Sequence, residues 1–160
     1  GPLPVFLPEA VIMAAQPISQ EYDFEGFHAP IVQFQETGVI WPGTVELGQP
    51  AVYSVIDFSQ PVDSVFAWEG AIMIEKGGLL NAMRFITKNV LAIVQEQSTT
   101  IDWLNHYMTL PLANPMQVEA GDMLHVAFQY RAGGSIPSLQ ASIQAQVINQ
   151  KVLAQVPAYA

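Results

Sequence analysis

The chain has 160 residues, of which 51% are hydrophobic and 12% are charged, and it contains no cysteine. This composition suits one folded domain, and it excludes a disordered chain, a disulfide scaffold, cysteine-ligated zinc and a cysteine nucleophile. The longest apolar runs, such as residues 10–15, are too short to span a membrane, and we see no signal-peptide pattern. We therefore expect a cytoplasmic protein without membrane partners.

The charge is unevenly distributed. Residues 1–75 contain ten acidic residues and no lysine or arginine, whereas residues 76–160 contain four acidic and five basic residues, for a net charge of −9. Because no basic patch is available to displace counterions from phosphates, the sequence argues against nucleic acid as a partner. Two explanations of the acidity stay open. It keeps an apolar domain soluble, which is the simpler explanation, or it attracts a cationic protein substrate.

We interpret residues 1–6 as an N-terminal tail or tag remnant, 7–150 as one β domain and 151–160 as a C-terminal tail. In the first half, we predict strands at 7–15, 31–35, 44–47, 51–58 and 64–75, with alternation of the side chains at 31–35 and 51–58. The polar, acidic and aromatic residues 20–30 are expected to form a loop or a short helix over the core. Gly70 interrupts the last strand, and an interior glycine usually marks a bulge or a sharp bend.

Residues 110–131 hold two strands joined by a turn. Glu119–Asp122 supplies the turn, because Gly121 can adopt a positive φ and aspartate can hydrogen-bond its own backbone. Pro111 and Pro115 lie in the first strand, and proline is tolerated in strands only at their starts, edges or bulges.

The remaining segments of the second half complete an all-β pattern. Residues 79–86 suit a strand or a helical turn, 89–95 form a strand and 101–110 are mixed. After a hairpin-type turn at 132–135, the alternation in 139–147 is the clearest in the chain and predicts a strand. Eight to ten short, mostly antiparallel strands, with at most short helical turns, predict a single β-barrel or β-sandwich.

The titratable residues give only weak signals of chemistry. The three histidines, His28, His106 and His125, lack metal-ligand spacing. His106 follows Asp102 by four residues and could form an acid–base pair with it, although a structural role is the simpler explanation. His125 is expected to be solvated or hydrogen-bonded. No serine-nucleophile or phosphate-binding motif occurs.

Aromatic residues offer a candidate binding surface. Trp68 lies inside a predicted strand and is expected in the core. Trp41 lies in a turn next to a proline and is the better exposed candidate, together with Tyr22 and Phe27 in the aromatic loop. Trp103 follows a polar loop and could close a barrel end or face a neighbouring domain.

Several short motifs resemble one family. Leu7–Met13 resembles the proline-led entry into the C-terminal β-barrel of protein arginine methyltransferases. Val65–Gly70 resembles a strand of that barrel. Thr99–Trp103, followed by Leu110–Leu112 and Gly121–Asp122, is similar to the run in that family that contains a Thr-His-Trp loop.

The resemblance implies a barrel that accompanies a Rossmann-type catalytic domain, which binds S-adenosylmethionine, and that helps to form the substrate groove and supports dimerisation. It implies no catalytic residue, no cofactor and no metal within this segment. Asp102 stands where the family has histidine, so a His–Asp relay cannot be transferred. Thr100, Asp102, Trp103 and His106 remain candidates for lining the groove.

Three other functions stay open. The first is a stand-alone β-sandwich that binds carbohydrate or protein through Trp41 and the loop from Tyr22 to Phe27. The second is a self-associating structural barrel without a ligand. The third, ranked last, is a glycosidase-like enzyme that uses paired carboxylates such as Asp57 and Asp63 or Glu69 and Glu75.

Overall fold

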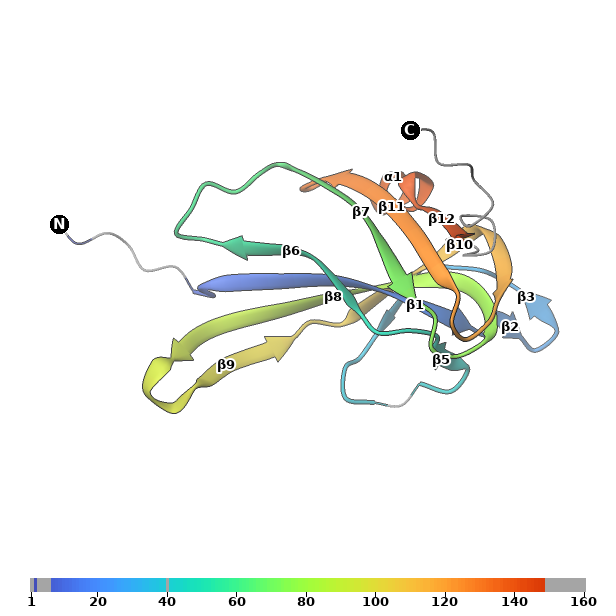
Figure 1. Cartoon of the computed structure of the whole chain (residues 1–160), viewed down its shortest axis with the longest axis horizontal. Coiled ribbons are helices and arrows are strands. Elements are labelled where there is room, and N and C mark those ends of the chain that lie inside the picture. The colour runs from blue at the N-terminus through green and yellow to red at the C-terminus, as the bar shows by residue number, and fades with distance from the viewer. Residues whose placement is uncertain (1, 3–6, 40, 149–160) are drawn as a thin grey trace, which may run out of the picture.

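An antiparallel sheet built on the two longest strands forms the centre of the fold (Figure 1). The computed structural model describes residues 2, 7–39 and 41–148. In the sheet, β1 (Ala10–Gln20) pairs with β8 (Gly78–Val94), from Ala10 opposite Val90 to Ile18 opposite Ala82. The order is β4-β10-β8-β1-β5, with β6 also paired to β1 and β9 to β8. The other strands of this sheet are β4 (Gln33–Gln35), β5 (Thr44–Glu46), β6 (Ala51–Asp57), β9 (Thr99–Leu104) and β10 (Tyr107–Val118).

A smaller sheet covers one end of the large one. It has the order β12-β11-β7 and consists of β7 (Val65–Met73), β11 (Met123–Arg131) and β12 (Gln144–Ile148). The helix α1 (Ile136–Ser142) connects β11 to β12, and a short 3-10 helix (Gln95–Gln97) connects β8 to β9. The two-residue strands β2 (Asp23–Phe24) and β3 (Phe27–His28) form a separate hairpin.

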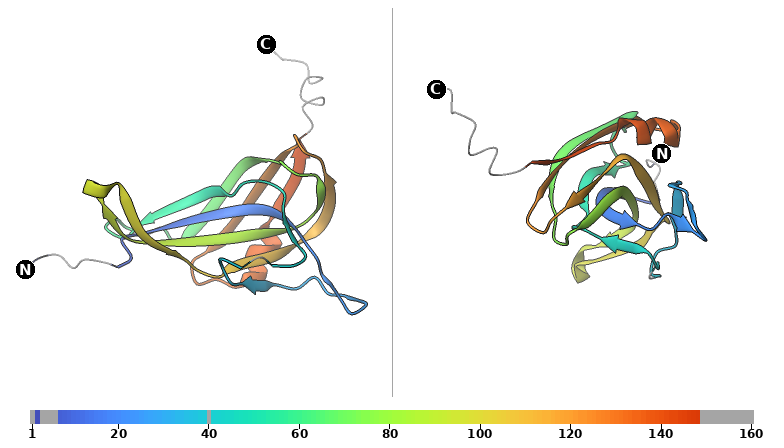
Figure 2. Two further views of the ribbon diagram at one scale, coloured as in Figure 1. Left: turned by 90° about the horizontal axis from the view of Figure 1, so that it is seen from below. Right: turned by 90° about the vertical axis from the view of Figure 1, so that its right-hand side faces the viewer.

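The main core lies between the two sheets. It combines Leu80, Met83 and Phe85 of β8 and Leu110 of β10 with Leu124, Val126 and Phe128 of β11. Strand alternation points the three β11 residues to one face. Beyond this core, β1, β6, β8 and β9 extend past the small sheet as a single layer (Figures 1 and 2).

The opposite face of the large sheet carries a buried polar cluster. The Arg84 guanidinium donates to Gln16 Oε1 at 3.2 Å and to Glu46 Oε1 at 2.9 Å, and it lies over the Tyr107 ring. Gln35 on the edge strand β4 donates to Thr44 Oγ1 at 3.1 Å on the opposite edge strand β5. This contact joins the two edges of the sheet, so the sheet curls around its polar face toward a barrel.

The predicted fold class is confirmed, because the described residues form antiparallel sheets with one helix of seven residues. The two strands within residues 110–131 are also confirmed, with Gly121 at a φ of 95° in the turn between them. The register of β10 against β8 shifts between Pro111 and Met116, so the prolines do lie at an irregularity.

The prediction of a bulge or bend at Gly70 is wrong. β7 pairs with β11 without a register shift, from Val65 opposite Arg131 to Met73 opposite Met123. Gly70 instead provides space, because the indole of Trp68 lies where its Cβ would be.

The strand predicted at 139–147 is half wrong. Residues 136–142 form α1, and only Gln144–Ile148 form a strand. Ser135 caps the helix by accepting a hydrogen bond from the Ser138 amide at 3.3 Å, and Pro137 lies in the first turn, where its missing N–H is no loss. Residues 132–135 therefore lead into a helix and do not form a hairpin turn.

Three further segments differ in part from what we expected. Residues 20–30 contain the β2–β3 hairpin where we expected a loop or short helix, and residues 79–95 belong mostly to one continuous strand, β8. The strand at 7–15 is longer than predicted and runs to Gln20. The tail predicted at 151–160 lies outside the described residues.

Candidate functional site

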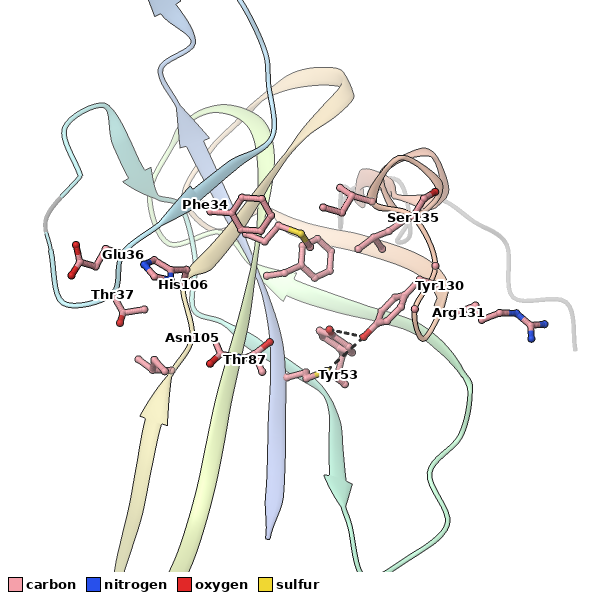
Figure 3. Close-up of a pocket in the computed structure, with 18 residues that line it drawn as sticks. Phe34, Glu36, Thr37, Tyr53, Thr87, Asn105, His106, Tyr130, Arg131 and Ser135 are labelled. Atoms are coloured by element: carbon pink, nitrogen blue, oxygen red, sulfur yellow. Dashed lines mark hydrogen bonds between the residues drawn. The ribbon is translucent and has the colours of Figure 1, made fainter. Parts of the chain in front are cut away.

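A cavity of about 750 Å³ opens where the two sheets diverge. We call it the inter-sheet cavity. Its wall comes from β1, β4, β6, β8, β10, β11, α1 and the turns beside them (Figure 3). The lining residues are Met13, Phe34, Glu36, Thr37, Tyr53, Phe85, Thr87, Leu104, Asn105, His106, Met108, Tyr130, Arg131, Gly133, Gly134, Ser135, Ile136 and Leu139. This volume falls within the usual range of small-molecule sites.

One wall of the cavity is part of an aromatic cluster. Tyr53 of β6 lies edge-on to Phe128 at 5.0 Å and to Phe85 at 6.2 Å between ring centroids. Phe85 lies edge-on to Phe128 at 5.2 Å, and Phe66 stacks on Tyr130 at 5.1 Å. Because each ring is held by its neighbours, the tyrosines keep a fixed orientation.

The hydroxyl groups of Tyr53 and Tyr130 meet at the cavity, 3.0 Å apart (Figure 3). Tyr130 also donates a hydrogen bond to Met13 Sδ at 3.6 Å. Burial raises the pKa of the Tyr53 hydroxyl, with a further contribution from Tyr130, and burial raises the pKa of Tyr130. Both hydroxyls therefore stay protonated at neutral pH and act as hydrogen-bond donors.

The charged residues of the lining lie at its periphery. Figure 3 shows the Glu36 carboxylate and the Arg131 guanidinium on opposite sides of the cavity, each directed away from the tyrosine pair. Both residues are exposed to solvent. The interior of the cavity is thus mainly apolar and aromatic and free of charge, with polar groups from the tyrosine pair and from Thr87 and Asn105.

The candidates predicted around Trp103 do not form one site. Strand β9 points Thr100 and Asp102 to one face of the sheet and Trp103 to the other, as alternation requires. Thr100 donates to Asp102 Oδ2 at 2.7 Å, and Lys88 Nζ lies 3.3 Å from the same oxygen. The hydrogen bond from Thr100, followed by the contact with Lys88, lowers the pKa of Asp102. This group has the features of a surface ion pair.

His106 is the one predicted groove residue that lines the inter-sheet cavity. It lies in the turn between β9 and β10, and no hydrogen bond to Asp102 is present among the described side chains, so the acid–base pair with Asp102 is not formed. Trp103 is 43% exposed on the single-layer extension of the sheet.

The aromatic residues predicted as a binding surface have different environments. Tyr22 is only 2% exposed and packs with Ile18 and Ala82, so the expectation that it lies on the surface is wrong. Phe27 is 77% exposed at the tip of the β2–β3 hairpin, and Trp41 is 38% exposed, with its indole N–H donating to the Glu36 carbonyl.

Two other candidates, His125 and Asp57, have structural partners. His125 lies 2.8 Å from Glu69 Oε1, so it is hydrogen-bonded as expected, although across the sheet to β7. Asp57 accepts from the Ser59 amide at 2.8 Å, and this turn lowers its pKa. Among the described residues, no group of three or more histidine, aspartate or glutamate side chains could hold a metal ion, and no helix has the length and apolar content to cross a membrane.

Sequence reasoning missed the centre of the cavity. Tyr53 and Tyr130 are 77 residues apart, and each reads as an ordinary strand residue by alternation. The one available signal was that Tyr130 falls on the apolar face of its strand while carrying a hydroxyl that needs a partner.

These features define a class: a protein of two curled antiparallel sheets, close to a half-barrel, with a ligand-sized cavity between them. No family model matches the chain, and no curated protein sequence matches it. Among solved structures, it is similar to a chain of the Trypanosoma brucei PRMT1 enzyme–prozyme heterotetrameric complex with AdoHcy, with a TM-score of 0.57 and 9% sequence identity. The match covers 77% of this chain and 48% of that chain, so this chain corresponds to about half of it. At this identity the likeness shows a shared β fold.

Proposed function

We propose that this chain is the non-catalytic accessory β-barrel of a protein similar to the arginine methyltransferases. In this role it docks against a Rossmann-type catalytic domain or a second copy, and it helps to position a substrate. S-adenosylmethionine would bind to the catalytic domain. The shared fold with half of a PRMT1 chain supports the proposal, together with the resemblance of the motifs around Val65–Gly70 and Thr99–Trp103.

The observation that carries the docking role is a projecting arm with exposed aromatic side chains. We define the arm as residues 21–32, which include the β2–β3 hairpin. It extends away from the two sheets in two perpendicular views (Figures 1 and 2). Its exposed apolar side chains are Phe24 at 43%, Phe27 at 77% and Ile31 at 52%, and Phe34 at 60% and Trp41 at 38% lie at its base.

An arm of this composition is expected to be covered in the working protein. Burying a phenylalanine side chain contributes roughly 1.5–3 kcal/mol, and several exposed apolar side chains on one projection mark an interaction surface. Tyr22 anchors the arm, because its ring is buried and its carbonyl accepts from the Ala29 amide at 2.8 Å. The arm therefore starts from a fixed base and presents its aromatic tip to a partner.

The first experiment concerns the catalytic domain. The coding sequence on the N-terminal side of residue 1 would be read, and S-adenosylhomocysteine binding would be measured by isothermal titration calorimetry. The protein from the whole reading frame and residues 1–160 would be compared. We expect binding only by the longer protein. A reading frame without a cofactor-binding domain would contradict the methyltransferase part of the proposal.

A second experiment tests the arm. Analytical ultracentrifugation of the whole protein and of its Phe27→Ser variant measures self-association, and a Val55→Thr variant is the control, since Val55 is 62% exposed on β6. We expect Phe27→Ser to weaken the dimer and Val55→Thr to leave it unchanged. Equal behaviour of all three proteins would contradict a docking role for the arm in a dimer.

A second candidate function is a stand-alone module that binds carbohydrate. A cavity of about 450 Å³ lies between the arm and Trp41, lined by acidic, aromatic and amide side chains that include Glu21, Asp23, Gln33 and Gln35. A tryptophan face beside carboxylates and amides suits a polar ligand with several hydroxyls. Titration of a glycan panel, followed by tryptophan fluorescence in the parent and in Trp41→Phe, tests it; no change with any glycan would contradict it.

A further inference from the structure

We propose that the inter-sheet cavity is a binding site for a neutral, mostly apolar small molecule that carries a carbonyl or ether oxygen, which accepts a hydrogen bond from Tyr130. This inference does not depend on the proposed accessory function. It rests on the size of the cavity, on the chemistry of its wall and on the hydrogen bonds of its two tyrosines.

The wall favours an apolar ligand. Seven apolar side chains contribute to it: Met13, Phe34, Phe85, Leu104, Met108, Ile136 and Leu139. At about 750 Å³ the cavity can enclose most of a molecule of two to three fused or linked rings. Removing that much apolar ligand surface from water is the main favourable contribution to binding.

The charges around the cavity favour a neutral ligand. The charged groups of Glu36 and Arg131 are exposed and point away from the tyrosine pair (Figure 3). A charged ligand group beside Tyr53 and Tyr130 would lose its hydration without gaining an opposite charge, and this costs more than a hydrogen bond returns. His106 is exposed at the edge of the cavity, so it does not alter the uncharged character of the interior.

The Tyr130 hydroxyl is a hydrogen-bond donor whose present acceptor is weak. The two hydroxyls lie 3.0 Å apart and either could donate, but Tyr130 also donates to Met13 Sδ at 3.6 Å. Because the Tyr130 hydroxyl carries one hydrogen, we assign Tyr53 as the donor between the two tyrosines. A thioether sulfur is a weak acceptor. A ligand oxygen at this place would replace the sulfur and form a stronger hydrogen bond, and Tyr130 would still accept from Tyr53.

The donor is also held in place before any ligand binds. Phe66 stacks on Tyr130 at 5.1 Å, and Tyr53 contacts Phe128 and Phe85 edge-on. Little side-chain freedom is therefore lost on binding, which raises the affinity available from a single hydrogen bond.

The test uses two fluorescent probes that differ in the acceptor. Prodan is a neutral naphthalene with a carbonyl group, and 2-(dimethylamino)naphthalene has the same ring system without it. Fluorescence titrations with both probes would be run on the parent protein and on the Tyr130→Phe variant. A Tyr107→Phe variant is the matched control, because Tyr107 lies next to the lining residue Met108 on β10 but does not itself line the cavity.

We expect saturable binding of prodan with a blue-shifted emission. Tyr130→Phe should weaken prodan binding by about three- to tenfold and leave the carbonyl-free probe within about twofold, since one hydrogen bond is lost. Tyr107→Phe should change neither affinity. Ile136→Trp, which fills the cavity from the first turn of α1, should abolish binding of both probes.

The proposal is overturned by any of four results: no saturable prodan binding, an equal loss or no loss of both probes in Tyr130→Phe, unchanged binding in a folded Ile136→Trp variant, or loss of prodan binding in Phe27→Ser. If Ile136→Trp does not fold, the two-probe comparison decides the question. Phe27→Ser separates this site from the arm, because a loss of prodan binding in that variant would place the probe on the arm and contradict the proposal.

Discussion

The indole ring of Trp68 lies against Gly70, two residues further along β7 and on the same face. A Cβ atom added to Gly70 would lie 2.9 Å from Trp68 Cε2, closer than carbon atoms approach in proteins. Trp68 is itself packed against Phe128 at 5.7 Å between ring centroids, so the indole has little room to withdraw.

We therefore expect Gly70→Ala to destabilise the protein by about 1–3 kcal/mol through overpacking, although alanine normally stabilises a strand relative to glycine. The free energy of unfolding in urea measures this change. Gly78→Ala is the control, because its Cβ would meet Leu47 Cδ2 at an ordinary 3.4 Å. A similar effect of both substitutions would refute the role assigned to Trp68.

Arg84 and Lys88 lie four residues apart on β8, and we expect their ion pairs to contribute differently to the free energy of unfolding. Arg84 is buried, with hydrogen bonds to Gln16 and Glu46, whereas the Lys88 side chain is 41% exposed beside Asp102. Arg84→Met should cost about 1–3 kcal/mol, because it leaves Gln16 Oε1 buried without a donor. Lys88→Met should cost less than about 1 kcal/mol. Thermal or urea unfolding compares the two, and equal costs would contradict this ranking.

The Tyr22 hydroxyl is buried without a hydrogen-bond partner among the described residues. We expect Tyr22→Phe to raise the free energy of unfolding at neutral pH by about 1 kcal/mol, because it removes an unsatisfied polar group and keeps the ring. Tyr53→Phe is the contrasting variant and should destabilise, since its hydroxyl is paired with Tyr130 at 3.0 Å. A loss of stability in Tyr22→Phe would indicate a partner for this hydroxyl.

Tyr22 also predicts a dependence on alkaline pH. Burial raises its pKa from 10.0 to about 12, so the folded state disfavours tyrosinate. Its titration therefore leaves the stability unchanged below pH 10, the unfolded value, and lowers the stability as the pH rises from 10 toward 12, because only the unfolded state ionises readily in this window. Urea unfolding across this window should show a smaller decline in Tyr22→Phe than in the parent. Parallel declines would show that other groups control alkaline unfolding.

Ser135 determines where α1 begins. Its hydroxyl accepts from the Ser138 amide at 3.3 Å, so Ser135→Ala removes the cap and should cost about 1 kcal/mol. Ser64→Ala, at an exposed position before β7, is the control and should be close to neutral. Urea unfolding measures both variants. A neutral Ser135→Ala would mean that packing of Leu139 alone holds the helix.

The sequence alone determined the fold class and several strands. Alternation is a local property, and in β7 and β11 the buried face agrees with it over the full strand, whereas in β6 the pattern breaks between Tyr53 and Ser54. Gly121 and Asp122 likewise determine their turn through backbone freedom and a local hydrogen bond from the Glu119 amide to Asp122 Oδ2 at 2.8 Å.

The sequence of residues 136–143 fits both the alternation of a strand and the spacing of a helix, and contacts with the rest of the fold favour the helix. Leu139 and Ile143 fit a strand by alternation, but with Ile136 they also fit the i, i+3, i+7 spacing of a helix, and these three residues pack on the core. Gln140 donates to the Pro111 carbonyl at 2.9 Å, a contact that ties α1 to β10. Because Pro111 is distant in sequence from Gln140, the local sequence pattern around α1 could not predict this contact.

The candidate site depended wholly on tertiary structure. The cavity arises where two sheets diverge, and Tyr53, Tyr130 and Met13 reach it from strands that are distant in sequence. Strand alternation placed each side chain on a face, but only the pairing and curling of the sheets decided which faces meet. Trp103 and Asp102, by contrast, lie on opposite faces of the sheet for a local reason, because successive strand residues point apart.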